Sequence, residues 1–309
     1  MDNNTTVSIS AIQIGFPDIR NVATFCSACS IIFYIITVLI NVLVFSVIIL
    51  KKLHEPMHIL FCNLLLNGII ISTTLLPKLT VDILSELKTI SVLGCYCQMF
   101  FMHVFVFTEL MLLSVMAYDR YVAICDPLRY YEIMTHAHMN RLIATTWLFS
   151  IVPCFVGVIL CARQPLCNFA VDKPYCDFYS VLKLLCTDQY FYNMYALVLT
   201  FLNIFPISII IYSYINIIEI CLQKSRKSYW KASQTCFTHL LMFIIYLIGV
   251  LFIIIQNRLP ANNIPQGVHA FLSLECFILP PLANPVIYGL RTKQIRTGVE
   301  ELTRFFFSS

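Results

Sequence analysis

Two long stretches of this chain contain no charged side chain. Residues 21–50 and 232–257 hold no Asp, Glu, Lys or Arg, and each exceeds the about 20 residues that an α-helix needs to cross the hydrocarbon core of a membrane. Of the 309 residues, 59% are hydrophobic and 12% are charged, against about 25% charged in an ordinary soluble domain. The chain is therefore predicted to be an all-α membrane protein.

Apolar runs bounded by charged residues or proline predict seven spans. The spans are residues 22–50, 57–80, 96–122, 140–161, 191–222, 234–257 and 265–290. The expected domains are an extracellular N-terminus (1–21), a seven-transmembrane helix bundle (22–290) and a cytoplasmic tail (291–309). In the tail, four apolar residues recur at the spacing of a short amphipathic helix that lies on a membrane surface. They are Ile295, Val299, Leu302 and Phe306.

The distribution of basic residues orients the bundle. With the N-terminus outside, 13 of the 20 Lys and Arg residues fall on the cytoplasmic side and 7 on the other, as the positive-inside rule favours. The overlapping sequons at Asn3 and Asn4 can be glycosylated only outside. The first 20 residues do not have the pattern of a cleaved signal peptide. The expected location is the plasma membrane, with several passes and an extracellular N-terminus.

Five cysteines gather at the extracellular end of this topology. Cys95 and Cys97 begin the third span, while Cys167, Cys176 and Cys186 lie in the long loop after the fourth. That compartment is oxidising, so disulfides are expected there. Spacing alone does not determine which cysteines pair.

Four motifs follow one another along the chain. They are MAYDRYVAICDPLRY at residues 116–130, SY at 213–214, KASQTCFTHL at 231–240 and PPLANPVIYGLRTKQIR at 280–296. In this order they resemble the odorant receptors, a branch of the rhodopsin-like G-protein-coupled receptors. The string GLRTKQIR is most similar to the class I, or fish-like, subgroup. Cys95 precedes Arg120 by 25 residues and Pro206 precedes Tyr214 by 8, as in the wider receptor family.

The resemblance implies a receptor that binds a small-molecule odorant from outside and activates a heterotrimeric G protein of the stimulatory, or olfactory, type, which raises cAMP. Membrane lipid is the other expected partner. The resemblance also implies the disulfides Cys95–Cys176 and Cys167–Cys186. The residues that it implies for activation and G-protein coupling are Asp119, Arg120, Tyr121, Tyr214, Lys231, His239, Asn284, Pro285 and Tyr288.

The charge pair Asp119–Arg120 needs an explanation, because a charge inside a membrane costs on the order of 3 kcal/mol. Arg120 could simply extend to the interface beside Asp119. It could also be a switch that leaves Asp119 when the sixth helix moves outward. No Asp or Glu lies between residues 223 and 274, so we expect Asp119 and tyrosine hydroxyls, rather than an acid on the sixth helix, to hold Arg120.

A second acidic residue, Glu109, lies 11 residues before Arg120 and therefore about 16 Å deeper along the helix. A lone carboxyl group there is expected to be protonated, bridged by water or bound to a cation. The resembled receptors usually have an aspartate where this chain has Gly68, beside Asn67, which argues against the family's usual sodium site. We name Glu109 and Asn67 as a possible cation or protonated-acid site.

Two basic residues suggest the chemistry of the ligand. His103 shares one face of the third span with apolar neighbours at helical spacing; such a stripe can pack against other helices or, as the resemblance implies, line an odorant pocket. Arg258 lies about 28 Å along the sixth span from His239. It can mark the membrane edge or bind a carboxylate through two hydrogen bonds.

The resulting hypothesis is an acidic, water-soluble odorant held between Arg258 and His103. The full set of expected ligand-binding residues is Met102, His103, Val106, Phe107, Phe178, Leu199, Leu202, Val250, Leu251, Ile254 and Arg258.

Other functions are less compatible with the sequence. A rhodopsin-like receptor for another ligand is the nearest alternative, although an amine receptor would need an Asp near Met102 and His103. A transporter would show inverted repeats, and a channel would show a filter sequence. No nucleophile–base pair or metal-binding cluster is evident. We therefore expect no enzyme activity, cofactor, metal or nucleic-acid partner.

Overall fold

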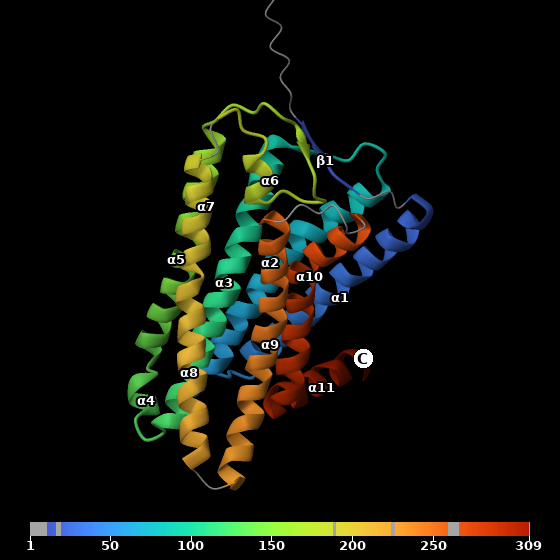
Figure 1. Cartoon of the computed structure of the whole chain (residues 1–309). Coiled ribbons are helices and arrows are strands. Elements are labelled where there is room, and N and C mark those ends of the chain that lie inside the picture. The colour runs from blue at the N-terminus through green and yellow to red at the C-terminus, as the bar shows by residue number, and fades with distance from the viewer. Residues whose placement is uncertain (1–10, 17–19, 188–189, 224–225, 259–265, 309) are drawn as a thin grey trace, which may run out of the picture.

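The computed structural model describes residues 11–16, 20–187, 190–223, 226–258 and 266–308. These residues form a bundle of long helices with a small sheet at one end (Figure 1). The long helices are α1 (Ala23–Leu50), α2 (Pro56–Leu84), α3 (Val92–Cys125), α5 (His136–Ala162), α7 (Tyr190–Leu202), α8 (Ile204–Gln223), α9 (Arg226–Arg258) and α10 (Gln266–Arg291). The short elements are β1 (Ala11–Ile14), η1 (Arg20–Val22), β2 (Thr89–Ser91), α4 (Tyr130–Ile133), β3 (Ala170–Val171), α6 (Phe178–Leu182) and α11 (Lys293–Ser308). Asn3 and Asn4 lie outside the described residues.

Six helical segments of the described chain are long and apolar enough to cross a membrane. They are α1, α2, α3, α5, the rod made of α7 and α8, and residues 238–256 of α9. Helix α10 packs along α1, α2 and α9 and covers the seventh predicted span. The predicted all-α, seven-helix bundle is confirmed.

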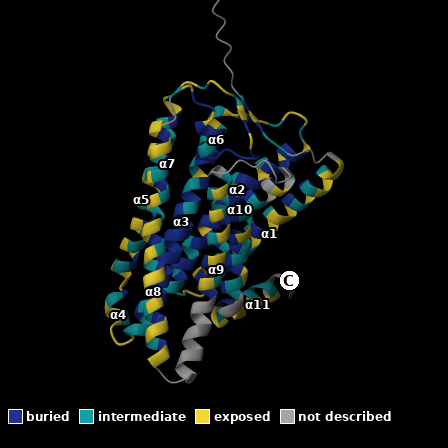
Figure 2. Cartoon of the chain, in the orientation of Figure 1, coloured by how far each residue is buried: buried dark blue, intermediate teal, exposed yellow. Residues whose placement is uncertain are grey.

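Helix α3 runs through the middle of the bundle (Figure 2). Within its most apolar window 78% of the residues are buried, compared with 22% in α5 and 22% in the α7–α8 rod. The outer helices instead expose large apolar side chains such as Phe155 and Ile211, which suits contact with lipid chains. Because α3 is surrounded, its polar residues must find partners inside the protein.

The fifth predicted span is a rod interrupted at Asn203. Pro206 has no N–H to donate to the carbonyl of Leu202, and its ring is incompatible with regular helical geometry there. The backbone N–H of Asn203 donates to Thr200 at 3.2 Å, one residue short of the α-helical partner. The interruption separates α7 from α8 and places Asn203 between them.

A three-stranded sheet covers one end of the bundle, and the sequence analysis did not predict it. The strand order is β2–β1–β3, with β1 antiparallel to β2 and parallel to β3. Ile12 and Ile14 are buried beneath it, whereas Gln13 points outward. We call this end of the molecule the sheet end, and the opposite end, where α11 lies, the tail end (Figure 1).

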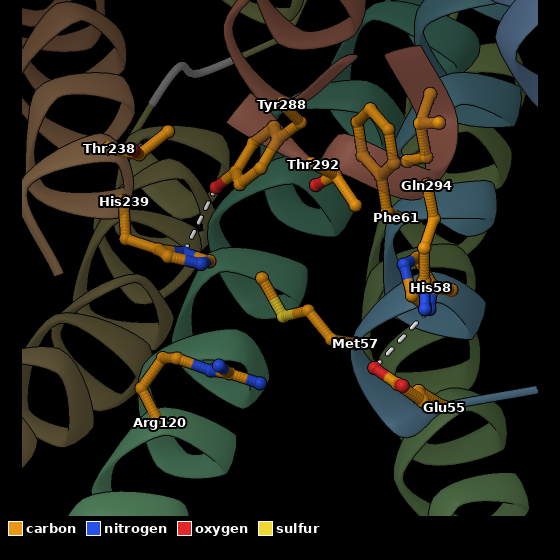
Figure 3. Close-up of a pocket in the computed structure, with 11 residues that line it drawn as sticks. Glu55, Met57, His58, Phe61, Arg120, Thr238, His239, Tyr288, Thr292 and Gln294 are labelled. Atoms are coloured by element: carbon orange, nitrogen blue, oxygen red, sulfur yellow. Dashed lines mark hydrogen bonds and ion pairs between the residues drawn. The ribbon is translucent and has the colours of Figure 1, made fainter. Parts of the chain in front are cut away.

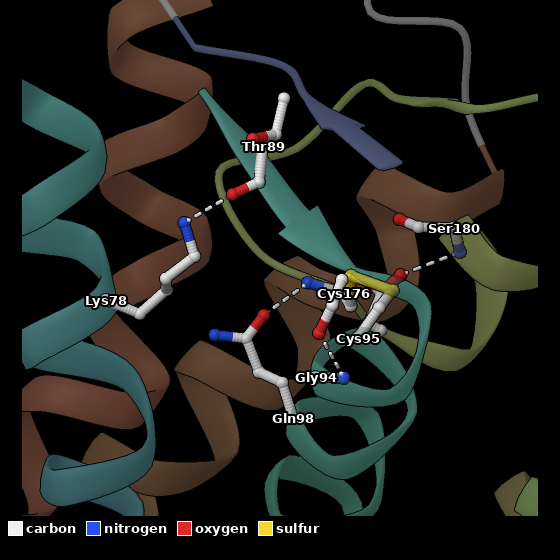
Figure 4. The surroundings of a disulfide bond; sticks show 9 residues. Lys78, Thr89, Gly94, Cys95, Gln98, Cys176 and Ser180 are labelled. Atoms are coloured by element: carbon white, nitrogen blue, oxygen red, sulfur yellow. Dashed lines mark hydrogen bonds between the residues drawn. A yellow bond between two sulfur atoms is a disulfide. The ribbon is translucent and has the colours of Figure 1, made fainter. Parts of the chain in front are cut away.

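Two disulfides fix the segment between α5 and α7 at the sheet end. Cys95 is bonded to Cys176, and Cys167 to Cys186, which are the pairs that the family resemblance implies. Figure 4 shows that the backbone N–H of Cys176 also donates to Gln98, at 2.8 Å. The loop is thereby tied to the first turns of α3, and α6 is held above the bundle.

The tail forms the expected amphipathic helix, α11, which packs on α1 and α10. Ile295 is fully buried, and Val299 and Leu302 pack against the same core. The side chain of Phe306 lies outside the described part of the structure. Gly298 allows a close approach, since a Cβ atom there would lie 2.5 Å from Val47.

Candidate functional site

A cavity of about 210 Å³ lies in the half of the bundle nearer the sheet end. Its wall comes from α3, α6, α7, α8, α9 and α10. Nine of the eleven expected ligand-binding residues line it: Met102, His103, Val106, Phe107, Phe178, Leu199, Val250, Leu251 and Ile254. The structure therefore gathers residues from four separate segments of the chain around one space.

Of the other two expected ligand-binding residues, the structure places only Leu202. Leu202 packs beside the cluster of Val104, Phe107 and Cys154 and is not among the residues that line the cavity. Its neighbour Asn203 lines the cavity instead, because the helix is interrupted at that position. Arg258 ends α9, and its side chain lies outside the described part of the structure.

Several polar residues of the cavity wall were not predicted from the sequence. Asp177, Tyr179, Thr200, Asn203 and Tyr246 all contribute to it. Only Asp177, directly after the disulfide-bonded Cys176, had a sequence signal that could have identified it.

A buried ion pair stabilises the loop beside the cavity. Lys173 and Asp177 form a salt bridge, and both side chains are less than a tenth exposed. Asp177 also caps α6 by accepting the backbone N–H of Ser180 at 2.7 Å. Burial alone would raise the pKa of the Asp177 carboxyl, but the charge and hydrogen bond of Lys173, with the Ser180 contact, hold that pKa below its ordinary value. Asp177 therefore stays ionised at neutral pH.

Tyr175 connects the same loop to the bundle. Its hydroxyl donates to the carbonyl of Ser273 in α10 at 3.3 Å, and the Lys173 ammonium lies 5.6 Å from the centre of its ring. Burial, together with the charge of Asp177, raises the pKa of the Tyr175 hydroxyl well above its ordinary value. The hydroxyl is therefore a permanent donor that fixes the loop against α10.

Glu109 lies in the middle of the bundle, 1% exposed. One carboxyl oxygen accepts a hydrogen bond from the Asn67 amide at 2.9 Å, and the other accepts one from the Asn284 amide at 2.8 Å. The three residues connect α2, α3 and α10. In the described part of the chain, no group of three His, Cys, Asp or Glu side chains could hold a metal ion.

At Gly68, α2 packs closely on α10. A Cβ atom at this position would lie 3.2 Å from Pro281 Cβ and 3.4 Å from the side-chain oxygen of Asn41. An aspartate there would therefore displace its neighbours.

At the tail end, Arg120 is paired with its neighbour in sequence. Its Nε and Nη2 atoms donate to one oxygen of Asp119, at 2.9 and 2.5 Å. The other oxygen of Asp119 accepts the hydroxyl of Tyr130 at 2.8 Å. The expected contact of a tyrosine hydroxyl with Arg120 stays a prediction, whereas the observed contact joins Tyr130 of α4 to Asp119.

A second cavity, of about 400 Å³, opens beside Arg120. Figure 3 shows Arg120 of α3 and His239 of α9 facing this space. His239 Nδ1 lies 2.9 Å from the hydroxyl of Tyr288 in α10. Three helices therefore meet around the cavity with polar side chains that could change partners.

The remaining residues expected to act in activation are spread around this end. The ring of Tyr121 lies 6.0 Å from that of Tyr212, Tyr214 is buried in α8, and Pro285 is buried within α10. Lys231 lies in α9, and its side chain is outside the described part of the structure.

Comparison with known proteins identifies the family. A family model described as olfactory receptor matches residues 29–305. Mouse olfactory receptor 4B13 is 32% identical over 303 residues, covering 96% of both chains. Human olfactory receptor 2K2 is 33% identical, covering 97% of this chain and 95% of its own, and human olfactory receptor 4S2 is 34% identical with the same coverage. The matched family consists of receptors and not enzymes, and the described helices that could cross a membrane make this chain a multi-pass membrane protein. The chain belongs to the olfactory receptor family.

Proposed function

We propose that the cavity near the sheet end binds an odorant and that this binding activates a stimulatory-type G protein, which raises cAMP. In this arrangement the sheet end and the N-terminus face the outside of the plasma membrane, and the tail end faces the G protein. The observation that carries the proposal is the cavity itself, which lies between α3 and α9 under a disulfide-bonded loop. Its wall is mostly apolar with a few polar groups, as is usual for small-molecule sites.

Helix α9 offers a route from the odorant to the G protein. Tyr246 lines the cavity, and its hydroxyl donates to the carbonyl of Val106 in α3 at 2.6 Å. His239 lies seven residues earlier, about 10.5 Å along the same helix, where it contacts Tyr288. An odorant that presses on Tyr246 would favour a displaced α9 and weaken the contacts around Arg120, which is the behaviour of a two-state element.

For the ligand we propose a carboxylate-bearing odorant, and for the receptor membership of the class I subgroup. Arg258 would bind the carboxylate from the end of α9, and His103 from α3. His103 Nδ1 lies 2.9 Å from the carbonyl of Met99; because a carbonyl can only accept, Nδ1 carries a hydrogen. His103 can therefore donate to a carboxylate through Nε2 only when the ring is protonated.

We also propose that Glu109 acts as a protonated acid rather than as a sodium ligand. Its two amide partners, Asn67 and Asn284, hold it between three helices without a second acidic group. The Glu109→Gln receptor should then retain its odorant responses. The responses of the wild-type receptor should be unchanged when choline replaces sodium in the assay buffer. A response that requires sodium would contradict this role.

The proposed function is tested by measuring cAMP in cells that display the receptor, using short carboxylic acids, amines, esters and alcohols. Arg258→Ala should weaken the response to carboxylates by about tenfold or more, the usual effect of losing a charged hydrogen-bonded partner. Arg163→Ala, which removes an exposed arginine at the end of α5, is the matched control. If Arg258→Ala leaves the carboxylate response unchanged at equal surface expression, the carboxylate site is wrong.

A further inference from the structure

The wall of the cavity near the sheet end is buried on one side and exposed on the other. On the inner side, Met102 and Leu110 of α3 and Tyr246 of α9 line the cavity and are at most 2% exposed. On the outer side, Ile204 of α8 is 52% exposed and Leu251 of α9 is 47% exposed, and both line the same cavity. A side chain that lines a cavity and also reaches the molecular surface lies where the cavity opens.

The neighbouring wall residues on these helices support an opening at this place. Helix α9 packs on α10 and α3, and its wall residues toward α7 and α8 are half-buried rather than buried. The half-buried wall residues of α7, α8 and α9 are Thr200, Asn203, Ile207, Leu247, Val250, Ile253 and Ile254. We call the gap between Ile204 and Leu251 the lateral opening.

At the sheet end, by contrast, protein covers the cavity. Asp177 and Phe178 line the cavity there, and both side chains are buried. The disulfide of Cys176 with Cys95 and the ion pair of Asp177 with Lys173 fix this cover in place. A ligand therefore meets protein at the sheet end and the lateral opening at the side of the bundle.

The lateral opening lies among helices that cross the membrane. Ile204 belongs to the α7–α8 rod and Leu251 to residues 238–256 of α9, and both segments are long and apolar enough to span a bilayer. Phe205 and Ile255, their neighbours in sequence, are more than half exposed. Such an apolar surface within a membrane span contacts lipid chains, so the lateral opening faces lipid rather than water.

The volume of the cavity makes the lateral opening important for the size of the ligand. An engineered cavity of about 150 Å³ holds benzene, so the present volume of about 210 Å³ corresponds to roughly eight heavy atoms, the size of hexanoic acid. A closed cavity of this volume would reject longer chains, because overpacking is destabilising. An open cavity would accept them, because the surplus methylene groups would stay in the lipid.

We infer that the cavity accepts amphiphiles whose alkyl chain passes through the lateral opening into the bilayer. The inference rests on the proposed function, because it assumes that the odorant occupies this cavity. It adds the ligand class, which is an acid with a chain longer than the cavity can hold. Leu251 lies seven residues before Arg258, about 10.5 Å along α9, so a carboxylate bound at the end of α9 is compatible with a chain that passes Leu251.

Straight-chain carboxylic acids of increasing length test the lateral opening. The probes have four, six, eight, ten and twelve carbons, and cAMP is measured at equal surface expression and below the concentrations at which the acids form micelles. The wild-type receptor should respond to the ten- and twelve-carbon acids. Ile204→Trp and Leu251→Trp, which narrow the lateral opening from two different helices, should weaken these two responses by about tenfold or more. The responses to the four- and six-carbon acids should change much less.

Ile211→Trp and Ile255→Trp are the matched controls. Both residues are 51% exposed on the same two helices and are not among the residues that line the cavity, so these variants should respond like the wild-type receptor to every length.

A wild-type response that ends near six carbons would overturn the inference without any variant and leave the proposed function intact. Unchanged responses of Ile204→Trp and Leu251→Trp to the long acids would also overturn it, as would an equal loss at every chain length. A receptor at the cell surface that responds to no acid of any length would contradict both the lateral opening and the carboxylate ligand.

Discussion

Asp172 and Asp177 are five residues apart in one loop, and each contacts a lysine, but their surroundings differ. Asp177 and Lys173 are buried, whereas Asp172 and Lys183 are 77% and 64% exposed. Breaking a buried ion pair leaves a lone charge and costs about 3–5 kcal/mol, while an exposed pair contributes about 0–1 kcal/mol. Asp177→Asn should therefore reduce surface expression strongly, and Asp172→Asn should not, as measured by flow cytometry of a tagged receptor.

The direction of the Asp177 pKa shift predicts how the stabilising effect of this residue depends on pH. A carboxyl whose pKa is lowered by folding contributes stability above its unfolded value of about 3.9, and that contribution is lost as the pH falls through the lower folded pKa. The difference between Asp177→Asn and the wild-type receptor should thus be the same at pH 5.5 and pH 7.5. Equal expression of the two Asp variants would show that the buried pair has no structural role.

Tyr130 and Tyr131 offer a second comparison at single residues. The hydroxyl of Tyr130 donates to Asp119, and burial together with the Asp119 charge raises its pKa, so it remains a donor at any physiological pH. Tyr131 is 83% exposed. Tyr130→Phe should loosen Asp119 and Arg120 and raise odorant-independent cAMP by about tenfold or more, since hydrogen bonds to charged groups contribute about 1.5–3 kcal/mol. Tyr131→Phe should leave basal cAMP unchanged, and a silent Tyr130→Phe would exclude the hydroxyl from the restraint.

At this scale the sequence was informative only where partners are close in sequence or share a helix face. Asp119 and Arg120 are adjacent, and the apolar stripe around His103 has helical spacing, so both could be recognised. Asn284 is 175 residues from Glu109 in the sequence, and the spacing of residues along a helix cannot predict such a contact. Asn203 lines the cavity because the helix is interrupted near Pro206. The sequence shows the proline but not the residue at which the helix breaks.

Among the helices, α9 packs closely on α10 at Gly249. A Cβ atom there would lie 2.8 Å from Cys276 Cβ and 3.0 Å from Cys276 Cα. At Gly289, by contrast, the nearest atoms would be 3.8 and 3.9 Å away. Gly249→Ala should separate α9 from α10 at a cost of about 1–3 kcal/mol, although alanine favours the helix by about 1 kcal/mol.

The expected result for Gly249→Ala is lower surface expression together with altered basal cAMP, while Gly289→Ala should be tolerated. Thermal stability of the detergent-purified receptor, measured alongside cAMP, would separate loss of folding from a shift in activity. Identical stability of the two alanine variants would mean that α9 does not pack on α10 as described.

The long helices could be predicted because each needs a continuous apolar run, and their ends follow charged residues or proline. The sheet could not, because β1 is four residues long and β3 only two. Such short strands depend on partners far apart in sequence, here Ile12 with Ile90 and Gln13 with Ala170. The interruption at Asn203 was missed for a related reason, since proline is common within membrane helices.

Across the whole molecule, α9 lines two cavities, one near its middle at His239 and one further along between Tyr246 and Ile254. The larger cavity lies beside Arg120 and is lined by His239, and the smaller cavity, the proposed odorant site, is lined by Tyr246 of the same helix. A ligand can shift the equilibrium between the resting and the displaced position of α9 only by its difference in affinity for these two states. The central claim is therefore that occupancy of the smaller cavity controls cAMP.

Filling that cavity with a side chain tests this claim most directly. Leu199 lines the cavity and is 6% exposed, whereas its neighbour Val198 is 51% exposed on the outer face of α7. With any agonist from the probe panel, and at equal surface expression, Leu199→Trp should abolish or strongly weaken the cAMP response while Val198→Trp retains it. An unchanged dose–response curve for Leu199→Trp would contradict the account.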